Sequence, residues 1–172
     1  MKNIEISTRR LLLKPLSSEY LQTVIEYAMD SEIKYMVYLP NESIYETINY
    51  LRSVDLEWEK EDPKFYEFAI LYQNDHIGAV SVNFENEIGE LGWTINKKYR
   101  GNGFAFEAAE ALVKYFAANF GTTHFIAHCD TENIASYKTM EKLGMIRTDE
   151  YGGRRNRRAS SDSFEYKYEL IL

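Results

Sequence analysis

The sequence predicts a mixed α/β layer fold whose front half is largely antiparallel. Three strand-like segments, at about 65–72, 76–84 and 88–95, are separated only by short polar turns, which is typical of an antiparallel meander. Before and after this meander, apolar residues recur at helical spacing. The expected order of elements is β-α-α-β-β-β-α-β-α-β-β, which gives about seven strands and four helices.

The elements before the meander are marked by breaking and capping residues. Leu11–Leu13 is followed closely by a proline and is predicted to be the first strand. Ser17 or Ser18 can cap the helix that comes next. Ser43 and Glu46 have the spacing of a capping box, in which each side chain bonds the backbone N–H of the other residue. A second helix is therefore expected to begin there.

The elements after the meander alternate between helix and strand. Apolar residues from Ala105 to Phe116 form one continuous helical face, and the first of them are small enough for close packing on a sheet. Gly144 is placed to end a later helix in the left-handed conformation. The remaining predicted elements are a strand at 125–128, a helix at 133–143, and strands at 145–151 and 163–172.

Length and composition limit the function classes. A chain of 172 residues is typical of one domain, so a single domain is expected over residues 1–172. The net charge of −7 argues against a general nucleic-acid binder and mildly favours a cationic acceptor. Cys129 is the only cysteine, which excludes an intrachain disulfide. The first residues lack a signal-peptide core, and no run reaches the roughly 18 apolar residues of a membrane helix, so a cytoplasmic location without a membrane partner is expected.

The sharpest motif lies between the last meander strand and the long helix. Two glycines let backbone N–H groups turn toward an anion, and the helix start adds unpaired N–H groups with a partial positive charge. A P-loop would need Lys and then Ser or Thr after the second glycine, and a dinucleotide fingerprint would need a third glycine, so both are excluded. A glycine-rich turn that merely caps the helix is the alternative to a diphosphate site. The motif comprises Arg100, Gly101, Asn102, Gly103, Phe104 and Ala105.

This loop, with the pattern Arg/Gln-x-x-Gly-x-Gly/Ala, resembles the pyrophosphate loop of the GNAT superfamily of N-acetyltransferases. The order of elements resembles the superfamily's along nearly the whole chain, which implies a mostly antiparallel mixed sheet with four helices packed on both faces. A second segment, from Asn133 to Met145, resembles the family's Asn-x-x-Ser/Ala segment and its closing Lys-x-Gly-Phe, with Met145 in place of Phe. The opening segment, Arg9 to Pro15, resembles the RimJ/RimL-type branch, which acetylates the N-termini of ribosomal proteins.

The resemblance implies an enzyme that uses acetyl-CoA as co-substrate and no metal. The motif loop is then expected to hold the cofactor's pyrophosphate. The pantetheine arm is expected to hydrogen-bond to the end of the fourth strand, at Trp93, Thr94 and Ile95, although ordinary sheet residues would look the same in the sequence. Asn133 matches the family's cofactor-contacting asparagine and also suits a helix N-cap, and both roles can hold at once.

Acetyl transfer to an amine needs a neutral amine, so a base or a desolvating pocket is required. Glu90 is the candidate base, acting directly or through water, because a carboxylate on this strand resembles the base of several family members. A solvated or ion-paired strand glutamate is the alternative. A backbone N–H of the same strand can stabilise the tetrahedral oxyanion.

The leaving thiolate gains from a proton donor, and Ser136 is the candidate because it matches the serine of the ribosomal branch. Many family members instead carry a tyrosine at the position of Met140, which cannot donate a proton. A small residue in a helix's first turn is the alternative for Ser136, and Tyr137 is expected to point elsewhere. Direct transfer without an acyl-enzyme is expected, because no base partner for Cys129 is evident.

The acceptor amine is expected between the first two helices, the loop Tyr35–Pro40 and the last hairpin. Aromatic and apolar residues of that loop, including Tyr35, Met36, Tyr38 and Leu39, can form a wall for the acceptor or belong to the core. The basic run at 154–158 is expected to be a solvated loop. His124 and His128 have no clear carboxylate partner in the sequence and are expected to be structural rather than metal ligands.

Three functions remain compatible with the sequence. The first is acetylation of a protein N-terminus, and the second is acetylation of a small amine such as a polyamine, an amino sugar or a drug. The third is a non-catalytic CoA-binding or sensor protein that keeps the loop but lacks turnover. Because family members are often dimers, the resemblance also allows a homodimer.

Overall fold

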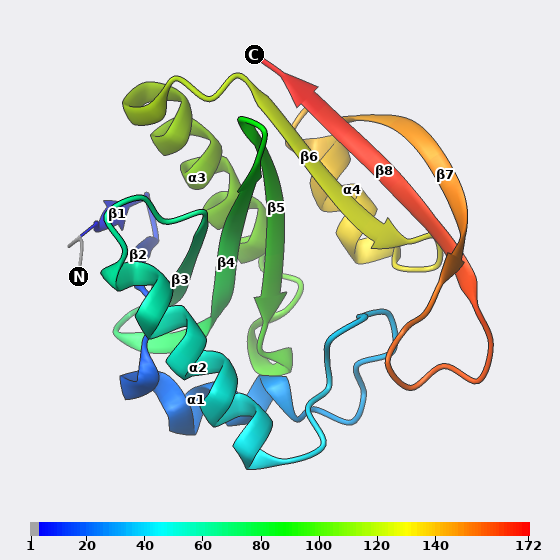
Figure 1. Cartoon of the computed structure of the whole chain (residues 1–172), viewed down its shortest axis with the longest axis horizontal. Helices are drawn as coiled ribbons and strands as arrows, with labels where there is room; N and C mark the ends of the chain where they lie inside the picture. Colours follow the sequence, from blue (N-terminus) through cyan, green and yellow to red (C-terminus); the bar gives the residue numbers. More distant parts are fainter. Residues whose placement is uncertain (1–3) are drawn as a thin grey trace.

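A computed structural model of the chain, which describes residues 4–172, shows one continuous mixed sheet (Figure 1). Within these residues the sheet has eight strands in the order β1-β2-β3-β4-β5-β6-β8-β7, and every neighbouring pair except β5–β6 is antiparallel. The strands are β1 (Ile6–Ser7), β2 (Leu11–Pro15), β3 (Phe65–Tyr72), β4 (Asp75–Glu85), β5 (Ile88–Ile95), β6 (His124–Asp130), β7 (Ile146–Arg154) and β8 (Ser163–Ile171).

The parallel pair at the middle of the sheet is short. Only Gly89 with Phe125 and Glu90 with Ile126 are paired between β5 and β6. Beyond Glu90 the two strands diverge, as Figure 1 shows for the lower half of β5. The sheet is therefore forked at its centre, and the backbone of β5 from Leu91 onward has no strand partner on that side.

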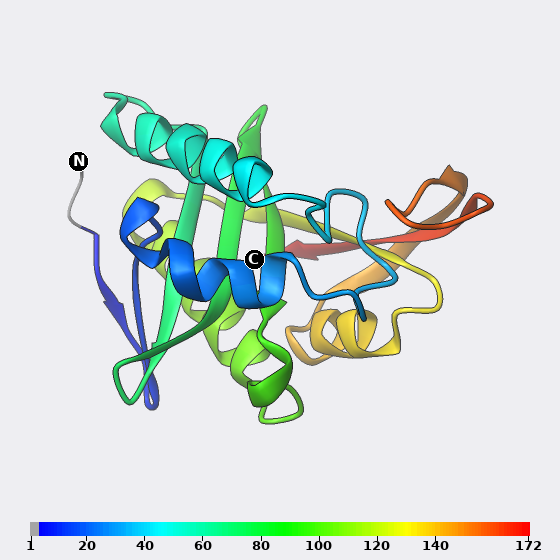
Figure 2. The same ribbon diagram turned by 90° about the horizontal axis from the view of Figure 1, so that it is seen from below.

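The four predicted helices cover both faces of the sheet (Figure 2). The pair α1 (Leu21–Ala28) and α2 (Ile44–Glu59) packs on one face, against β4 and β3 respectively. The pair α3 (Phe104–Phe120) and α4 (Ile134–Lys142) packs on the other face, against β4, β5 and β6. Two short 3-10 turns, Ser18–Tyr20 and Lys97–Tyr99, precede α1 and follow β5.

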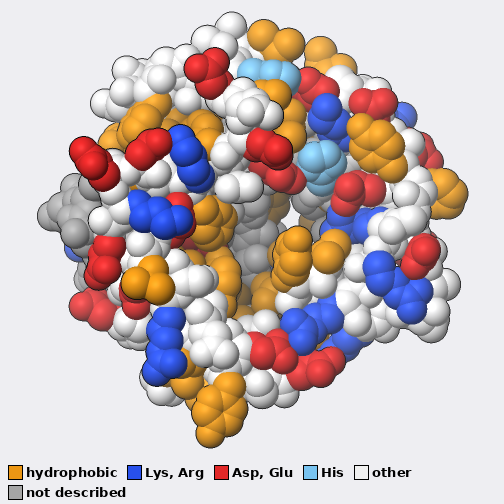
Figure 3. Space-filling model, in the orientation of Figure 1, with side chains coloured by type: hydrophobic (Ala, Val, Ile, Leu, Met, Phe, Trp, Pro, Cys, Tyr) orange, Lys and Arg blue, Asp and Glu red, His pale blue; other side chains and the backbone are white. Residues whose placement is uncertain are grey.

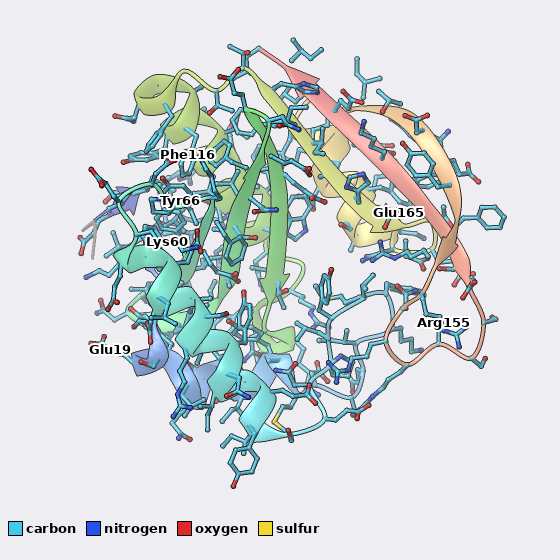
Figure 4. The ribbon with its side chains drawn as sticks, viewed as in Figure 1. Glu19, Lys60, Tyr66, Phe116, Arg155 and Glu165 are labelled. Carbon is cyan, nitrogen blue, oxygen red and sulfur yellow. The ribbon has the colours of Figure 1, made fainter. Side chains whose placement is uncertain are left out.

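The core between sheet and helices is mostly aliphatic and includes a cluster of aromatic rings. Tyr66 on β3 and Phe116 on α3 lie with ring centroids 4.9 Å apart and are close neighbours in Figure 4. Trp58 at the end of α2 packs edge-on against Phe68 at 5.1 Å and donates its indole N–H to the carbonyl of Glu67. The same carbonyl also accepts from the N–H of Leu16 at 2.8 Å, so α2 and the residue after β2 share this acceptor.

The structure confirms the predicted fold class and corrects two details. The sheet has one strand more than the seven expected, because β1 is only two residues long and too short to show a periodic pattern. Ser17 caps the turn before α1, as predicted, by accepting a hydrogen bond from the N–H of Glu19. The capping box is wrong: Ser43 is the N-cap of α2, but its side chain makes no capping bond, and Glu46 pairs with Arg157 instead.

Candidate active site

A cleft of about 570 Å³ opens where β5 and β6 diverge. Figure 3 shows a hollow near the middle of this face, with acidic, basic and histidine side chains around its rim. All of the predicted site residues line the cleft except Asn102 and Glu90. The predicted residues on its walls are Trp93, Thr94, Ile95, Arg100, Gly101, Gly103, Phe104, Ala105, Asn133 and Ser136.

The glycine loop has the backbone conformation that its sequence predicts. Gly101 has φ 79° and Gly103, the N-cap of α3, has φ 75°, both in the left-handed region. Nothing lies within 4 Å of the place that a Cβ of Gly101 would occupy. Backbone conformation rather than crowding therefore favours glycine there.

This conformation leaves backbone donors available at one end of the cleft. Within residues 4–172, the N–H groups of Gly101, Asn102 and Gly103 donate no hydrogen bond to a protein acceptor. The first turn of α3 adds N–H groups that an α-helix leaves without intrahelical partners. Successive free donors beside a positive helix end favour an anion.

The loop is braced from outside the cleft. Arg10 donates from Nη1 to the carbonyl of Asn102 at 3.1 Å, stacks 4.5 Å from the ring centre of Phe104, and pairs with Glu107 at 2.7 Å. The side chain of Asn102 donates to the carbonyl of Tyr99 at 3.0 Å. Asn102 thus closes the loop with its side chain, and its backbone N–H makes no hydrogen bond within residues 4–172.

The strand end at Trp93–Ile95 presents backbone rather than charge. Because the ladder with β6 ends at Glu90, the polar backbone groups of β5 on that side face the cleft. Arg100 donates from Nε to the carbonyl of Ile95 at 2.9 Å and lies 3.5 Å from Asp30. Its guanidinium therefore ties the loop to the strand end.

The opposite wall comes from β6 and the start of α4. Asn133 caps α4, with its Oδ1 accepting from the N–H of Ser136 at 3.3 Å, so the N-cap half of its predicted dual role is confirmed. Ser136 and the buried Cys129 both line the cleft at this wall. Burial raises the pKa of the Cys129 thiol to about 11, so the thiol stays protonated at neutral pH.

Glu90 and His128 form a pair that the sequence did not reveal. The Nδ1 atom of His128 lies 2.7 Å from Oε1 of Glu90. His128 lines the cleft, whereas Glu90 does not. The expectation that neither histidine has a carboxylate partner is wrong, since His124 also contacts Glu169 at 2.7 Å. Alternation along the strand predicts that both histidines lie on one face of the sheet. Their carboxylate partners are on other strands, so only the tertiary structure identifies them.

The last hairpin closes the cleft from the side opposite the glycine loop. Arg154 lines the cleft, contacts Glu165, and donates to the carbonyl of Tyr35 at 3.0 Å. Arg157 donates its N–H to the carbonyl of Met36 at 2.9 Å and its Nη1 to the carbonyl of Tyr38 at 3.1 Å. The basic run is therefore not simply solvated. The side chain of Arg154 is only 10% exposed.

Some predictions about the acceptor wall hold and others do not. Tyr35 and Met36 line the cleft, as predicted, but Tyr38 is 83% exposed and Leu39 packs against the core. Met140 also lines the cleft, so the position that resembles the family's proton-donating tyrosine carries a side chain without a proton to donate. Tyr137 points away, with its ring centroid 5.9 Å from that of Tyr166, which confirms the prediction.

Among residues 4–172, no group of three or more His, Cys, Asp or Glu side chains lies close enough together to hold a metal ion. None of the helices formed by these residues has the length and apolar character needed to cross a bilayer.

Comparisons with known proteins agree with this geometry. Residues 10–146 match the family described as the acetyltransferase (GNAT) domain. The uncharacterized N-acetyltransferase YnaD of Bacillus subtilis is 30% identical over 148 residues, which cover 84% of each chain. The ribosomal-protein-serine acetyltransferase of Escherichia coli is 27% identical over 82 residues, which cover 46% of each chain.

A solved structure supports the fold independently. The ribosomal L7/L12 alpha-N-protein acetyltransferase RimL, determined in complex with coenzyme A, superposes with a TM-score of 0.88 over 98% of both chains at 16% identity. At that identity the likeness concerns the fold. With the family match over most of the chain, the forked sheet and the glycine loop at the start of α3, the protein belongs to the GNAT family and is an acetyltransferase.

Proposed function

We propose that the protein transfers the acetyl group of acetyl-CoA to a primary amine, and that a protein N-terminus is the preferred acceptor. The observation that carries this proposal is the row of free N–H groups at the glycine loop, beside a β5 edge that lacks a strand partner. One end of the cleft suits a diphosphate, and the strand edge suits an amide-bearing arm.

The cofactor would lie along the fork. The N–H groups from Gly101 to Ala105 would hold the pyrophosphate, and Arg100 would keep the loop fixed to β5. The pantetheine arm would pair with the backbone at Trp93–Ile95 in the manner of an added strand. Asn133, which keeps its amide nitrogen free while Oδ1 caps α4, would contact the arm from the other wall.

The chemistry proposed is direct attack of the amine on the thioester in a ternary complex. The raised pKa of Cys129 supports this route, because a protonated, buried thiol is a poor nucleophile. Ser136 would give a proton to the leaving thiolate, because it lines the cleft from the first turn of α4. The pair of Glu90 and His128 lies at the same wall as a proton acceptor.

The choice of acceptor rests on likeness and on charge. The Escherichia coli relative is described as acting on ribosomal-protein serine, which favours an N-terminal serine here. The net charge of −7 favours approach of a cationic amine. Small amines such as polyamines, amino sugars or drugs are the second candidate, because Tyr35 and Met36 form a wall that suits either kind of acceptor.

A thiol-release assay tests the proposal. Acetyl-CoA is mixed with the protein and, in turn, a serine-starting peptide, the same peptide already acetylated at its N-terminus, spermidine and glucosamine. We expect thiol release with the free peptide and none with the blocked one. Turnover only with a small amine would show that a small amine, and not a protein N-terminus, is the acceptor. Binding of CoA in calorimetry without turnover on any amine would favour a non-catalytic CoA-binding sensor.

Two broader expectations join the proposal. Residues 1–172 would act as a single N-acetyltransferase domain, because the walls of the cleft come from elements spread along most of the chain. The family resemblance also allows a homodimer, which sedimentation velocity would test.

A further inference from the structure

Strand β6 carries two histidine–carboxylate pairs on the same face of the sheet. His124 contacts Glu169 on β8 at 2.7 Å, and His128 contacts Glu90 on β5 at 2.7 Å. The two imidazoles are similarly exposed, 31% and 23% of the side chain respectively. They differ in place, because only His128 lines the cleft.

The second pair sits at the apex of the fork. Glu90 is the last β5 residue that pairs with β6, and its partner is Ile126. His128 is two residues further along β6, on the same face as Glu90, where the strands have begun to separate. The side-chain contact therefore joins the two strands at the point where the fork begins.

The contact determines which nitrogen of the imidazole is available. A glutamate that is ionised can only accept, so Nδ1 of His128 carries the proton that it donates to Glu90. The neutral ring then keeps a lone pair on Nε2, on the other side of the ring. Within residues 4–172, Nε2 of His128 has no hydrogen-bond partner.

Charged groups on the neighbouring elements act on this imidazole. Its hydrogen bond to Glu90 raises the pKa of His128 above the ordinary value, against the effect of burial. On β8, the charge of Glu165 raises the same pKa and that of Lys167 lowers it. Figure 4 shows Glu165 on the strand that flanks β6. The other ionisable residues on the cleft walls are Glu32, Lys34, Tyr35, Tyr99, Arg100, Cys129 and Arg154.

We propose that His128 is the catalytic base of this acetyl transfer and that Glu90 is a positioning residue that orients its imidazole. The inference rests on the function proposed above and gives the base role to a residue that its sequence did not single out. Of this pair, Glu90 does not line the cleft. His128 does, and its Nε2 atom carries no proton in the neutral ring.

The proton balance is simple. The amine nitrogen forms a bond to the thioester carbonyl carbon, and Nε2 of His128 takes the proton that this nitrogen loses. The C–S bond then breaks, and the electron pair leaves with sulfur. The thiolate receives a proton either directly from the imidazolium or from Ser136, whose hydroxyl then regains a proton from the imidazolium, and the products are an amide and free coenzyme A. No oxidant, reductant or metal takes part.

Matched variants test the assignment. H128Q keeps a side chain that can bond Glu90 but cannot take up a proton, and H124Q removes the corresponding imidazole outside the cleft. With a serine-starting peptide we expect kcat to fall at least about a hundredfold in H128Q, with little change in H124Q or in the KM for acetyl-CoA. H128Q with wild-type kcat would overturn the proposal.

The pH profile separates the two roles. A base must be unprotonated, so we expect the acidic limb of kcat to move to lower pH in E90Q and to lose its His128 component in H128Q. The acceptor amine titrates identically in all variants. A shift of the acidic limb between variants therefore reports a change in an ionisable group of the protein. If E90Q abolishes turnover while H128Q keeps the limb, Glu90 is the base and the proposal fails.

Two measurements keep the test independent of folding and of the proposed function. NMR titration of the His128 imidazole in the free protein should give a higher pKa in wild type than in E90Q, and equal values would contradict the positioning role. Calorimetry with coenzyme A shows whether each variant still folds and binds. Absence of turnover by wild type on every amine would refute the proposed function. If wild type turns over and H128Q has the same kcat, only the assignment of His128 as the base would be refuted.

Discussion

The two edges of the cleft are built in different ways. The loop edge, residues 99–107, is a short stretch of chain whose shape comes from two left-handed glycines and the start of α3. The hairpin edge, residues 154–158 with the facing loop 35–38, is held by contacts between residues about 120 apart in the chain. One edge is a local structure, and the other exists only after the sheet has formed.

This difference indicates where each function of the cleft can be changed. The loop edge depends on backbone conformation, so substitutions there should alter cofactor affinity with little effect elsewhere. The hairpin edge depends on buried ionic contacts, so substitutions there should alter folding and acceptor binding first. Asp130, 1% exposed, illustrates this point: burial pushes its pKa up, but hydrogen bonds from Ser163, Glu132 and Asn156 hold it below the ordinary value.

The largest effect is expected at Arg154. R154M leaves Glu165 and Asp130 without their guanidinium, and loss of one partner of a buried ion pair typically costs about 3 kcal/mol of unfolding free energy or more. R155M is the matched control, because Arg155 and Asp162 are both more than half exposed, and it should change stability by less than about 0.5 kcal/mol. Urea unfolding measures both. Equal effects would show that the hairpin edge is not held by burial.

The next effect concerns Glu67, a buried carboxylate on β3 that contacts Tyr50 of α2. Burial raises the pKa of Glu67 to about 7 from 4.5, although a hydrogen bond from Tyr50 opposes the shift. The folded protein therefore keeps a proton that the unfolded chain releases between these values, and stability falls as pH rises through this window. E67Q should gain up to about 3 kcal/mol relative to wild type between pH 4.5 and 7.

Unfolding at several pH values checks this expectation, with the exposed Glu59 changed to Gln as control. His76 has the opposite tendency, since burial lowers its pKa to about 4 and its contribution is lost as pH falls. That contribution is common to wild type and E67Q, so it cancels in the difference. A difference that stays constant from pH 4.5 to 8 would contradict the assigned pKa.

A smaller effect is expected at the loop edge. An alanine at Gly101 must adopt the left-handed conformation at a cost of about 1–2 kcal/mol, so the Kd for coenzyme A should rise about five- to thirtyfold in G101A. Gly121, at the end of α3, has φ 69° and equally open surroundings. G121A should lower Tm, because it carries the same conformational cost, but it should leave the Kd for coenzyme A unchanged. Calorimetry that finds the same Kd in wild type and G101A would break the link between loop conformation and binding.

The smallest effect is expected at Arg157. R157Q weakens the hydrogen bond to the carbonyl of Tyr38 and the ion pair with Glu46, worth about 1 kcal/mol at a partly exposed site. Steady-state kinetics should show the acceptor KM raised about fivefold. The KM for acetyl-CoA should not change, and the exposed Arg158 changed to Gln serves as control. An effect on acetyl-CoA instead would mean that the two edges are not independent.

Much of the fold was predictable because its signals are local. Helical spacing and the short polar turns place α1 to α4 and the β3–β5 meander close to their observed bounds. β1 escaped prediction because two residues show no periodicity, and it pairs only through long-range contact with β2. The capping box at Ser43 failed because Arg157, distant in the chain, competes for Glu46.

The candidate site likewise contains features that short-range sequence predicts and features that depend on distant partners. The glycine loop and the Asn133 cap are short-range structures, and both were readable from adjacent residues. The roles of His128 and Arg154 were not readable, because each depends on a partner from another strand or loop. No spacing rule in one sequence brings Glu90 beside His128.

The sequence by itself therefore determined the element order, the left-handed loop at the start of α3 and the cap of α4, since backbone preferences act over a few residues. The tertiary structure alone decided where the sheet forks, which imidazole faces the cleft and how Arg154 and Arg157 hold the loop at 35–38. The physical reason is that these features are pairings of distant charged and polar groups, whose partners are chosen only when strand register and helix packing bring them within hydrogen-bonding distance.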